Sequence, residues 1–286
     1  MLIPALIGLF VIDHRSGDAA PLLFLLCLAL AIRAAWELRG LLAVRNMRPQ
    51  LVESVAGCVA LLLAAWWPHL KGGDTVASET SLGLIGLTMS LCVIGLLGMA
   101  AARYRRAGES MEMFGANLVI VAYCGLLLAT TAQLRWLAGP QAGYLLLGSL
   151  IVTAKLGDVS AYTVGRLFGK RKMSPLLSPG KTWAGFFGAL GGAALASWLW
   201  LTFVTPLFGD GWRAPPAWAS LLYGLVIGLV ALFGDLCESL IKRDVGQKDS
   251  APLLPGFGGL LDLLDSVLYA GPAAVLLWKL LPLATW

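Results

Sequence analysis

The sequence has few of the residues that most often serve catalysis or metal binding in soluble proteins. Its two histidines, His14 and His69, lie far from the most strongly charged stretch of the chain, which argues against a histidine base. The five cysteines occur singly in apolar runs without a Cys-x-x-Cys pair, so neither a zinc site nor a disulfide framework is expected. Charged residues make up only 13% of the chain, about half the share typical of soluble domains. An ordinary soluble protein is therefore excluded.

Long apolar runs occupy most of the remaining sequence. Hydrophobic residues make up 58% of the 286 residues, and the mean hydropathy is +0.80. A run at residues 2–12 is short for a membrane span and is either a short or tilted span or a signal segment. We predict an all-α, polytopic integral membrane protein with about nine transmembrane helices. Eight runs approach the ~20 residues that a helix needs to cross a bilayer, at roughly 20–38, 51–67, 81–102, 114–134, 143–164, 183–204, 218–236 and 260–283.

The distribution of lysine and arginine predicts which loops face the cytoplasm. Loops around 33–50, 103–112, 165–182 and 242–259 hold 15 of these residues, whereas the alternate segments hold five. Because loops rich in Lys and Arg stay in the cytoplasm, we expect a multi-pass protein of the cytoplasmic (inner) membrane with these loops inside. The net charge of +5 has the same explanation, so anionic lipid rather than nucleic acid is the expected partner.

Residues 234–266 carry an unusual concentration of charge. Five aspartates, one glutamate, two lysines and one arginine fall within 33 residues. On a helix, Asp235, Glu238, Ser239 and Lys242 would form one polar stripe. Ionisable groups on an otherwise apolar helix face are costly, which favours a functional site. The alternative is a solvated loop whose charges only set the orientation of the chain.

The second half of this stretch adds further carboxylates after a loop rich in glycine and proline. Asp262 and Asp265 are an i, i+3 pair at the start of the last apolar run. Carboxylate oxygens are the ligands that Mg²⁺ prefers, and they leave positions for phosphate oxygens. The nearby Lys242, Arg243 and Lys248 could neutralise further phosphate charge. The stretch therefore predicts a site that handles a polyphosphate through a metal ion.

A second group of polar residues lies in and after the sixth apolar run. Lys155, Asp158, Tyr162 and Arg166 are three or four residues apart and would share one helix face. A structural Lys155–Asp158 ion pair is the alternative interpretation. Glu37 and Glu53, near the ends of other runs, are expected to be solvated. The basic loop at 165–172 leads to a helix start, where anions are favoured, with Ser178, Lys181 and Thr182 beside it.

These blocks resemble phosphatidate cytidylyltransferases, also called CDP-diacylglycerol synthases. The resemblance covers about 110 residues at the C-terminal end, and the N-terminal half is similar only in hydropathy. One block reads Ser239-x-x-Lys242-Arg243-x4-Lys248-Asp249, followed by Pro255-Gly256-x-Gly258-Gly259-x-x-Asp262-x-x-Asp265. The others read Asp158-x-x-Ala161-Tyr162, Gly165-Arg166-Leu167-Phe168-Gly169-Lys170 and Ser178-Pro179-Gly180-Lys181-Thr182-Trp183.

Three positions depart from the family pattern. Phe257, Leu263 and Ala184 stand where the family usually has His, Arg and Glu. If the family's residues bind substrate there, the departures would redirect or abolish activity. The alternatives are thus a related transferase acting on another lipid phosphate, or a non-catalytic membrane protein or transporter.

The resemblance implies transfer of CMP from CTP to phosphatidate, giving CDP-diacylglycerol and pyrophosphate. It further implies Mg²⁺, alone or with a second cation, and by analogy a homodimer. Residues 1–140 are interpreted as structural transmembrane helices that could make oligomer contacts, and residues 141–286 as the catalytic region. The expected metal ligands are Asp235 and Asp262, with Asp265, Asp249 and Ser239 as further ligands or orienting groups. The expected substrate-binding residues are Lys242, Arg243, Lys248, Arg166, Lys181, Asp158, Tyr162, Ser178 and Thr182.

Overall fold

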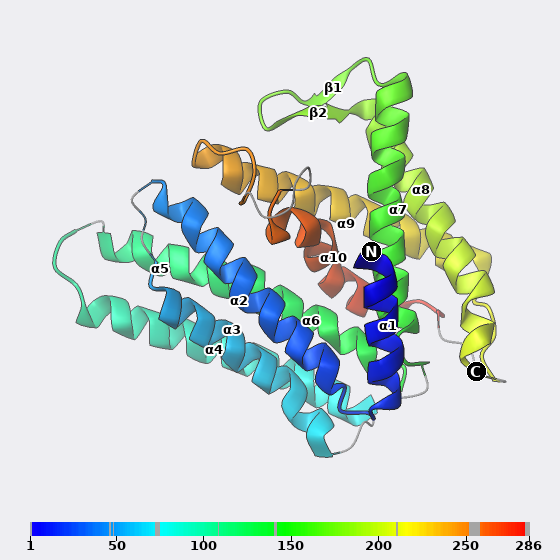
Figure 1. Ribbon diagram of the computed structural model, residues 1–286, viewed down its shortest axis with the longest axis horizontal. Helices are drawn as coiled ribbons and strands as arrows, with labels where there is room; N and C mark the ends of the chain where they lie inside the picture. The colour runs from blue at the N-terminus through cyan, green and yellow to red at the C-terminus, as the bar shows by residue number, and fades with distance from the viewer. Residues whose placement is uncertain are drawn as a thin grey trace.

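The computed structural model of the protein describes residues 2–45, 47, 49–71, 75–107, 109–139, 142–209, 211–251 and 258–283. Within these ranges the chain is almost entirely helical (Figure 1), and eight helices are long and apolar enough to cross a bilayer. The prediction of an all-α polytopic membrane protein is confirmed. The doubtful first run forms a 14-residue helix, whose length of about 21 Å is less than the ~30 Å of the hydrocarbon core. The predicted count of nine transmembrane helices is reached only if this short helix is counted as a span.

The elements follow one another along the chain with few long connections. The first group comprises α1 (Leu2–Arg15), α2 (Pro21–Ala43), α3 (Leu51–Trp66), η1 (Trp67–Lys71), α4 (Thr75–Ala102), α5 (Glu109–Ile120), the π-helical turn η2 (Val121–Leu126), α6 (Leu127–Ala132) and η3 (Gln133–Arg135). The second comprises α7 (Leu145–Phe168), β1 (Lys172–Ser174), β2 (Ser178–Thr182), α8 (Trp183–Phe203), η5 (Thr205–Phe208), α9 (Ala217–Asp244) and α10 (Leu260–Leu280).

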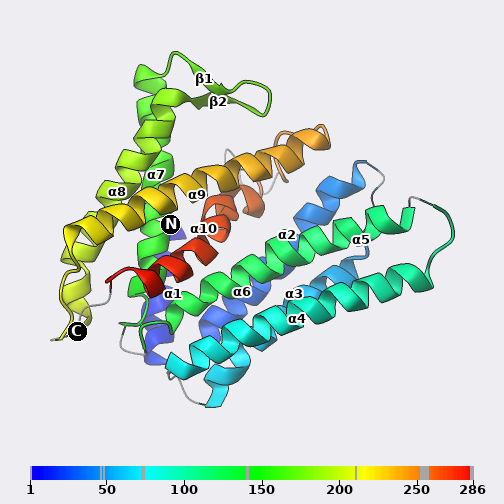
Figure 2. The same cartoon turned by 180° about the vertical axis from the view of Figure 1, so that it is seen from behind.

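The last helix, α10, joins the two groups. Helices α2 to α6 lie side by side on one side of the molecule, α7 to α9 lie on the other, and α10 runs between them (Figures 1 and 2). Accordingly, α10 contacts α9 and α7 as well as α6 and α2. Residues at the start of α10 are therefore held by both halves of the chain.

Small residues allow the helices of the second group to approach closely. A Cβ atom added to Gly224 of α9 would lie 2.6 Å from both the carbonyl oxygen of Ala193 and the Cα of Ala194 on α8. Both of these are backbone atoms and could not move aside without shifting the helix. Membrane helices commonly associate through small residues in this way, since dispersion contacts replace the hydrophobic effect inside a bilayer. The α8–α9 contact therefore depends on glycine at this position.

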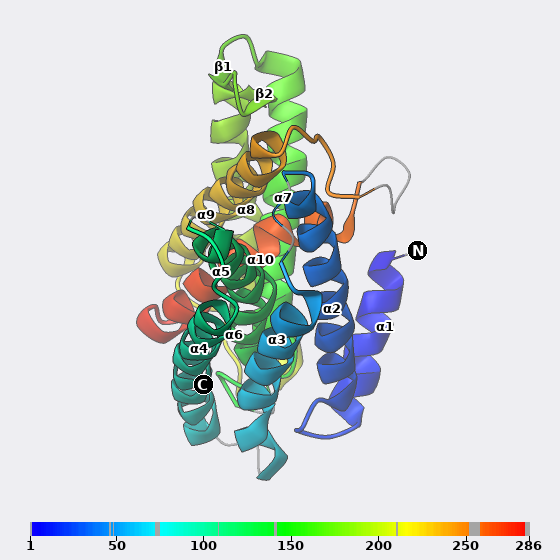
Figure 3. The same ribbon diagram turned by 90° about the vertical axis from the view of Figure 1, so that its left-hand side faces the viewer.

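A two-stranded hairpin projects beyond the helix ends, between α7 and α8 (Figures 1 and 3). Strands β1 and β2 are antiparallel, with Lys172 opposite Thr182 and Ser174 opposite Ser178. The sequence predicted a basic loop and a turn here, and the structure shows instead that both segments pair as strands. The hairpin carries basic side chains over the end of the helix bundle.

Substitution of Gly224 by alanine should destabilise the protein through the α8–α9 contact. We expect a loss of about 1–3 kcal/mol, which is typical of overpacking, seen as a lower melting temperature in detergent. Gly191 of α8 is a matched control, because no atom lies within 4 Å of an added Cβ there, and Gly191→Ala should be neutral or slightly stabilising. Equal melting temperatures for the two variants would contradict the packing argument.

Candidate functional site

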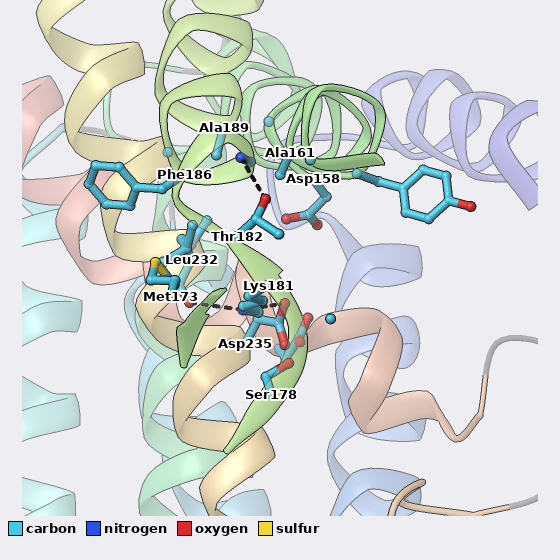
Figure 4. A pocket seen from close by; sticks show the side chains of 18 of the residues that line it. Asp158, Ala161, Met173, Ser178, Lys181, Thr182, Phe186, Ala189, Leu232 and Asp235 are labelled. Atoms are coloured by element: carbon cyan, nitrogen blue, oxygen red, sulfur yellow. Dashed lines mark hydrogen bonds and ion pairs between the residues drawn. The ribbon is translucent and has the colours of Figure 1, made fainter. Parts of the chain in front are cut away.

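A cavity of about 740 Å³ opens among α7, the hairpin, α8, α9 and the start of α10. Ten charged side chains line it, five basic and five acidic. In Figure 4, Lys181 and Asp235 meet in the cavity, while Phe186, Met173 and Leu232 form an apolar side. The basic lining residues are Lys155, Arg166, Lys172, Lys181 and Lys242, and the acidic ones are Asp158, Asp235, Glu238, Asp262 and Asp265.

Three carboxylates converge at one place in this cavity. Asp235 and Glu238 lie one turn apart on α9, and Asp265 comes from α10; one oxygen of each lies within 4.8 Å of the others. Gly234 makes this possible, because a Cβ there would lie 3.0 Å from the carbonyl oxygen of Asp265. We call Asp235, Glu238 and Asp265 the acidic cluster. Within the part of the chain that the structure describes, no other group of three such ligands was found.

Two lysines neutralise part of the acidic cluster. The Nζ atom of Lys181, from β2, lies 2.6 Å from Oδ2 of Asp235 (Figure 4). The Nζ atom of Lys242 lies 2.6 Å from Oε2 of Glu238 and 2.5 Å from Oδ1 of Asp262. The other oxygen of Glu238 is buried without a hydrogen-bond partner. Carboxylate oxygens of this kind are the ligands that a hard cation prefers.

Asp262 lines the same cavity, but its oxygens are engaged by the protein. Oδ1 accepts from Lys242, and Oδ2 accepts from the backbone N–H and hydroxyl of Ser250 at 3.0 and 2.7 Å. Oδ2 also accepts from the N–H of Gly259 at 2.7 Å, which caps the first turn of α10. The structure thus brings Asp235 together with Asp265 and Glu238, and places Asp262 at the edge of the group. That Asp262 ligates a metal stays a prediction.

Glu238 is a site residue that the sequence interpretation placed on the polar stripe but not among the ligands. The signal was its i, i+3 spacing from Asp235, which puts both carboxylates on the cavity face of α9.

The sequence interpretation was also wrong about Glu37. Its expected solvation is wrong, because the residue is only 1% exposed.

The reason for the burial of Glu37 lies at the start of α10. Its Oε2 accepts from the N–H of Leu261 at 3.0 Å and lies 3.4 Å from the hydroxyl oxygen of Ser250, and its Oε1 lies 2.9 Å from Arg33. The first turn of a helix leaves N–H groups without partners, and this carboxylate from α2 satisfies one of them. The N-terminal half of the chain therefore helps to fix the helix that carries Asp262 and Asp265.

Residues of α7 and the hairpin supply another wall of the cavity. Arg166 of α7 donates to the hydroxyl of Tyr162 at 2.9 Å, and both residues line the cavity. Lys172, which the sequence interpretation did not include among the site residues, also lines it. Thr182 lines it too, but its hydroxyl accepts from the N–H of Gly185 at 3.1 Å and so caps α8.

Several candidates from the sequence do not line the described cavity. Ser239 is buried on α9 but is not part of the cavity lining, and Lys248 and Asp249 are exposed. Arg243 is also exposed and donates to the carbonyl oxygens of Leu177 and Gln247. Of the family departures, Leu263 and Ala184 do not line the cavity, and Phe257 lies outside the described residues.

The sequence matches the cytidylyltransferase family over residues 1–281. The chain belongs to this family. A phosphatidate cytidylyltransferase of Mycobacterium leprae is 34% identical over 227 residues, which are 76% of this chain and 66% of that protein. The enzyme of the same name from Pseudomonas aeruginosa is 36% identical over 228 residues, covering 79% and 71%. That from Mycobacterium bovis is 42% identical over 133 residues, covering 46% and 41%. The cytidylyltransferase chain thus spans less than two thirds of two of these three relatives.

Removal of the Glu37 carboxylate should destabilise the start of α10. Glu37→Ala leaves the N–H of Leu261 buried without a partner, which costs about 1–3 kcal/mol, and we expect a lower melting temperature and faster hydrogen exchange in the first turn of α10. Glu79→Ala removes an exposed carboxylate and should change neither quantity. Unchanged exchange in Glu37→Ala would show that this contact does not hold the helix.

Proposed function

We propose that the protein transfers CMP from CTP to phosphatidate, giving CDP-diacylglycerol and pyrophosphate. A phosphate oxygen of the lipid attacks the α-phosphorus of CTP, and the bond from that phosphorus to the bridging oxygen of the β-phosphate breaks. Both electrons of the broken bond leave with pyrophosphate. The observation that carries the proposal is the acidic cluster beside Lys181 and Lys242 in one cavity, in a member of the cytidylyltransferase family.

The charge of the cavity supports a cation-dependent reaction. Its five basic and five acidic side chains balance, whereas the two substrates together bring several negative charges. Two anions that repel each other must be held at reacting distance. A neutral cavity can do this only if cations enter with the substrates.

The residues present fit Mg²⁺, and Asp235, Glu238 and Asp265 would hold it. The donors are all carboxylate oxygens, and Oε1 of Glu238 has no other partner among the described residues. When bound, the ion would supply positive charge for the phosphate oxygens and the departing pyrophosphate.

The side chains of the protein bind and orient the two substrates in this proposal. Lys181 and Lys242 donate to carboxylates in the structure. In this proposal, their ammonium groups also donate hydrogen bonds to phosphate oxygens of the bound substrates. Arg166 and Lys172 line the same cavity from α7 and β1 and would meet phosphates entering from the hairpin side. No protein nucleophile or general base is needed, since a phosphomonoester is already largely a dianion near neutral pH.

Two departures from the family pattern, Leu263 and Ala184, do not line the cavity. The excess of Lys and Arg in alternate loops supports a cavity that faces the cytoplasm, where CTP is available. We retain a homodimer as part of the proposal by analogy with the family.

Substitution of Asp235 should abolish the transfer while the protein stays folded. The assay supplies purified protein in detergent with labelled CTP, Mg²⁺ and phosphatidate, and measures CDP-lipid. We expect Asp235→Asn to lower the rate by about 100-fold or more, because charge that meets the developing transition state is lost. Asp244→Asn is a matched control on the same helix, since this exposed residue pairs with Arg45 outside the cavity and should keep normal activity. A wild-type protein that forms no CDP-lipid would overturn the proposed function.

Binding of Mg²⁺ can be measured without turnover. A ligand that binds only the folded state raises the melting temperature, so we expect Mg²⁺ together with CTP to stabilise the wild-type protein. The stabilisation should be lost in a Glu238→Gln variant, which removes one charge from the acidic cluster. Full stabilisation of this variant would place the cation elsewhere.

A further inference from the structure

Along α9, the lining of the cavity changes from charged residues near the C-terminal end to small or apolar residues farther from that end. The acidic cluster lies on the part of α9 that leads to its C-terminal end at Asp244. Farther from that end, the lining residues are small or apolar, namely Gly228 and Ala231 of α9, Ala154 of α7 and Ala189 of α8. A lipid whose phosphate reaches the acidic cluster would extend its chains toward this apolar part.

Lys155 lies at the boundary between the two parts. It is 11 residues before Arg166 on α7, or about 16 Å deeper along the helix, and it is close to the middle of this membrane-spanning segment. Its neighbour in sequence, Ala154, belongs to the apolar lining. A lysine at such depth is costly and calls for a specific role.

The ammonium group of Lys155 is held in place by two residues. Its Nζ donates to Oδ2 of Asp158 at 3.2 Å and to the hydroxyl of Ser266 at 2.8 Å. The hydroxyl of Ser266 in turn donates to the same oxygen of Asp158 at 3.1 Å. An ammonium has three N–H donors, so one remains beyond these two contacts, and the side chain is 35% exposed where it lines the cavity.

Ser266 connects this lysine to the acidic cluster, because it directly follows Asp265 on α10. The position of Lys155 is therefore fixed relative to the place where the lipid phosphate would react. In a diacyl glycerol phosphate, only a few bonds separate the phosphate from the first ester carbonyl. That carbonyl lies at the boundary between the polar head and the acyl chains.

We propose that the third N–H of Lys155 donates to an ester carbonyl of the lipid substrate. This inference rests on the proposed function and names a residue that selects ester-linked over ether-linked lipid. Asp158 and Ser266 position the ammonium group, and Lys155 contacts the substrate away from the reacting phosphorus. The residue acts on binding of the lipid, so its loss changes KM for the lipid more than kcat.

The test compares phosphatidate with a dialkyl glycerol phosphate of the same chain length, which lacks both carbonyl oxygens. A hydrogen bond from a charged donor is worth about a factor of 10 or more in affinity, so the wild-type protein should prefer the ester lipid by about 10-fold in kcat/KM. In the double variant Lys155→Met/Asp158→Asn, which leaves no unpaired carboxylate, the preference should fall below about 2-fold. The single variant Lys155→Arg should retain part of the preference for the ester lipid, because arginine keeps hydrogen-bond donors at this position.

The preference is also measured by binding, in a native mass spectrum of the intact protein with equal amounts of the two lipids and no CTP. This readout tests Lys155 even if no CDP-lipid forms, so failure of the proposed function is recognised separately. Lys279→Met is the control, because this lysine near the far end of α10 pairs with Glu79 and should leave the preference unchanged. An unchanged preference in the double variant, or an equal loss of both lipids, would overturn the inference.

Discussion

The close approach of α9 and α10 is the constraint on which the site depends. It brings Asp235, Glu238 and Asp265 to within 4.8 Å of one another, and each ionised pair at that distance repels by roughly 3 kcal/mol at an effective dielectric constant near 20. Positive charge close by stabilises such a group. Lys181 and Lys242 supply it in the structure. A bound cation would compete with these lysines for the carboxylates, and phosphate groups would compete with the carboxylates for the lysines.

The rest of the fold supplies the rigidity that this arrangement needs. Small residues let α8 and α9 pack backbone against backbone, and α10 lies between the two groups of helices (Figure 2). Glu37 reaches from α2 to the first turn of α10, so a residue that does not itself line the cavity holds the helix that presents Asp265. The N-terminal helices therefore contribute to the geometry of the site, although they supply none of its cavity-lining residues.

The cavity combines two environments that a lipid phosphate requires together. Charged side chains of the acidic cluster and its lysines line one part of the cavity, and small or apolar residues of α7, α8 and α9 line another. Lys155, Asp158 and Ser266 lie where the two meet. An ammonium group is tolerated at that boundary because two polar partners replace the water that it has lost.

The sequence alone determined the type and the approximate number of the spanning helices, since apolar runs of membrane length have few alternatives to a spanning helix. It also pointed to the two charged blocks that line the cavity, because ionisable groups stand out in apolar runs. Only the tertiary structure decided which carboxylates form a group, since Glu238 and Asp265 are 27 residues apart and their distance depends on how α9 packs against α10. It likewise placed Glu37 inside the protein and Asp249 outside the cavity. Periodicity reports which face of a helix a residue occupies, whereas the neighbour of that face is set by packing between segments distant in the chain.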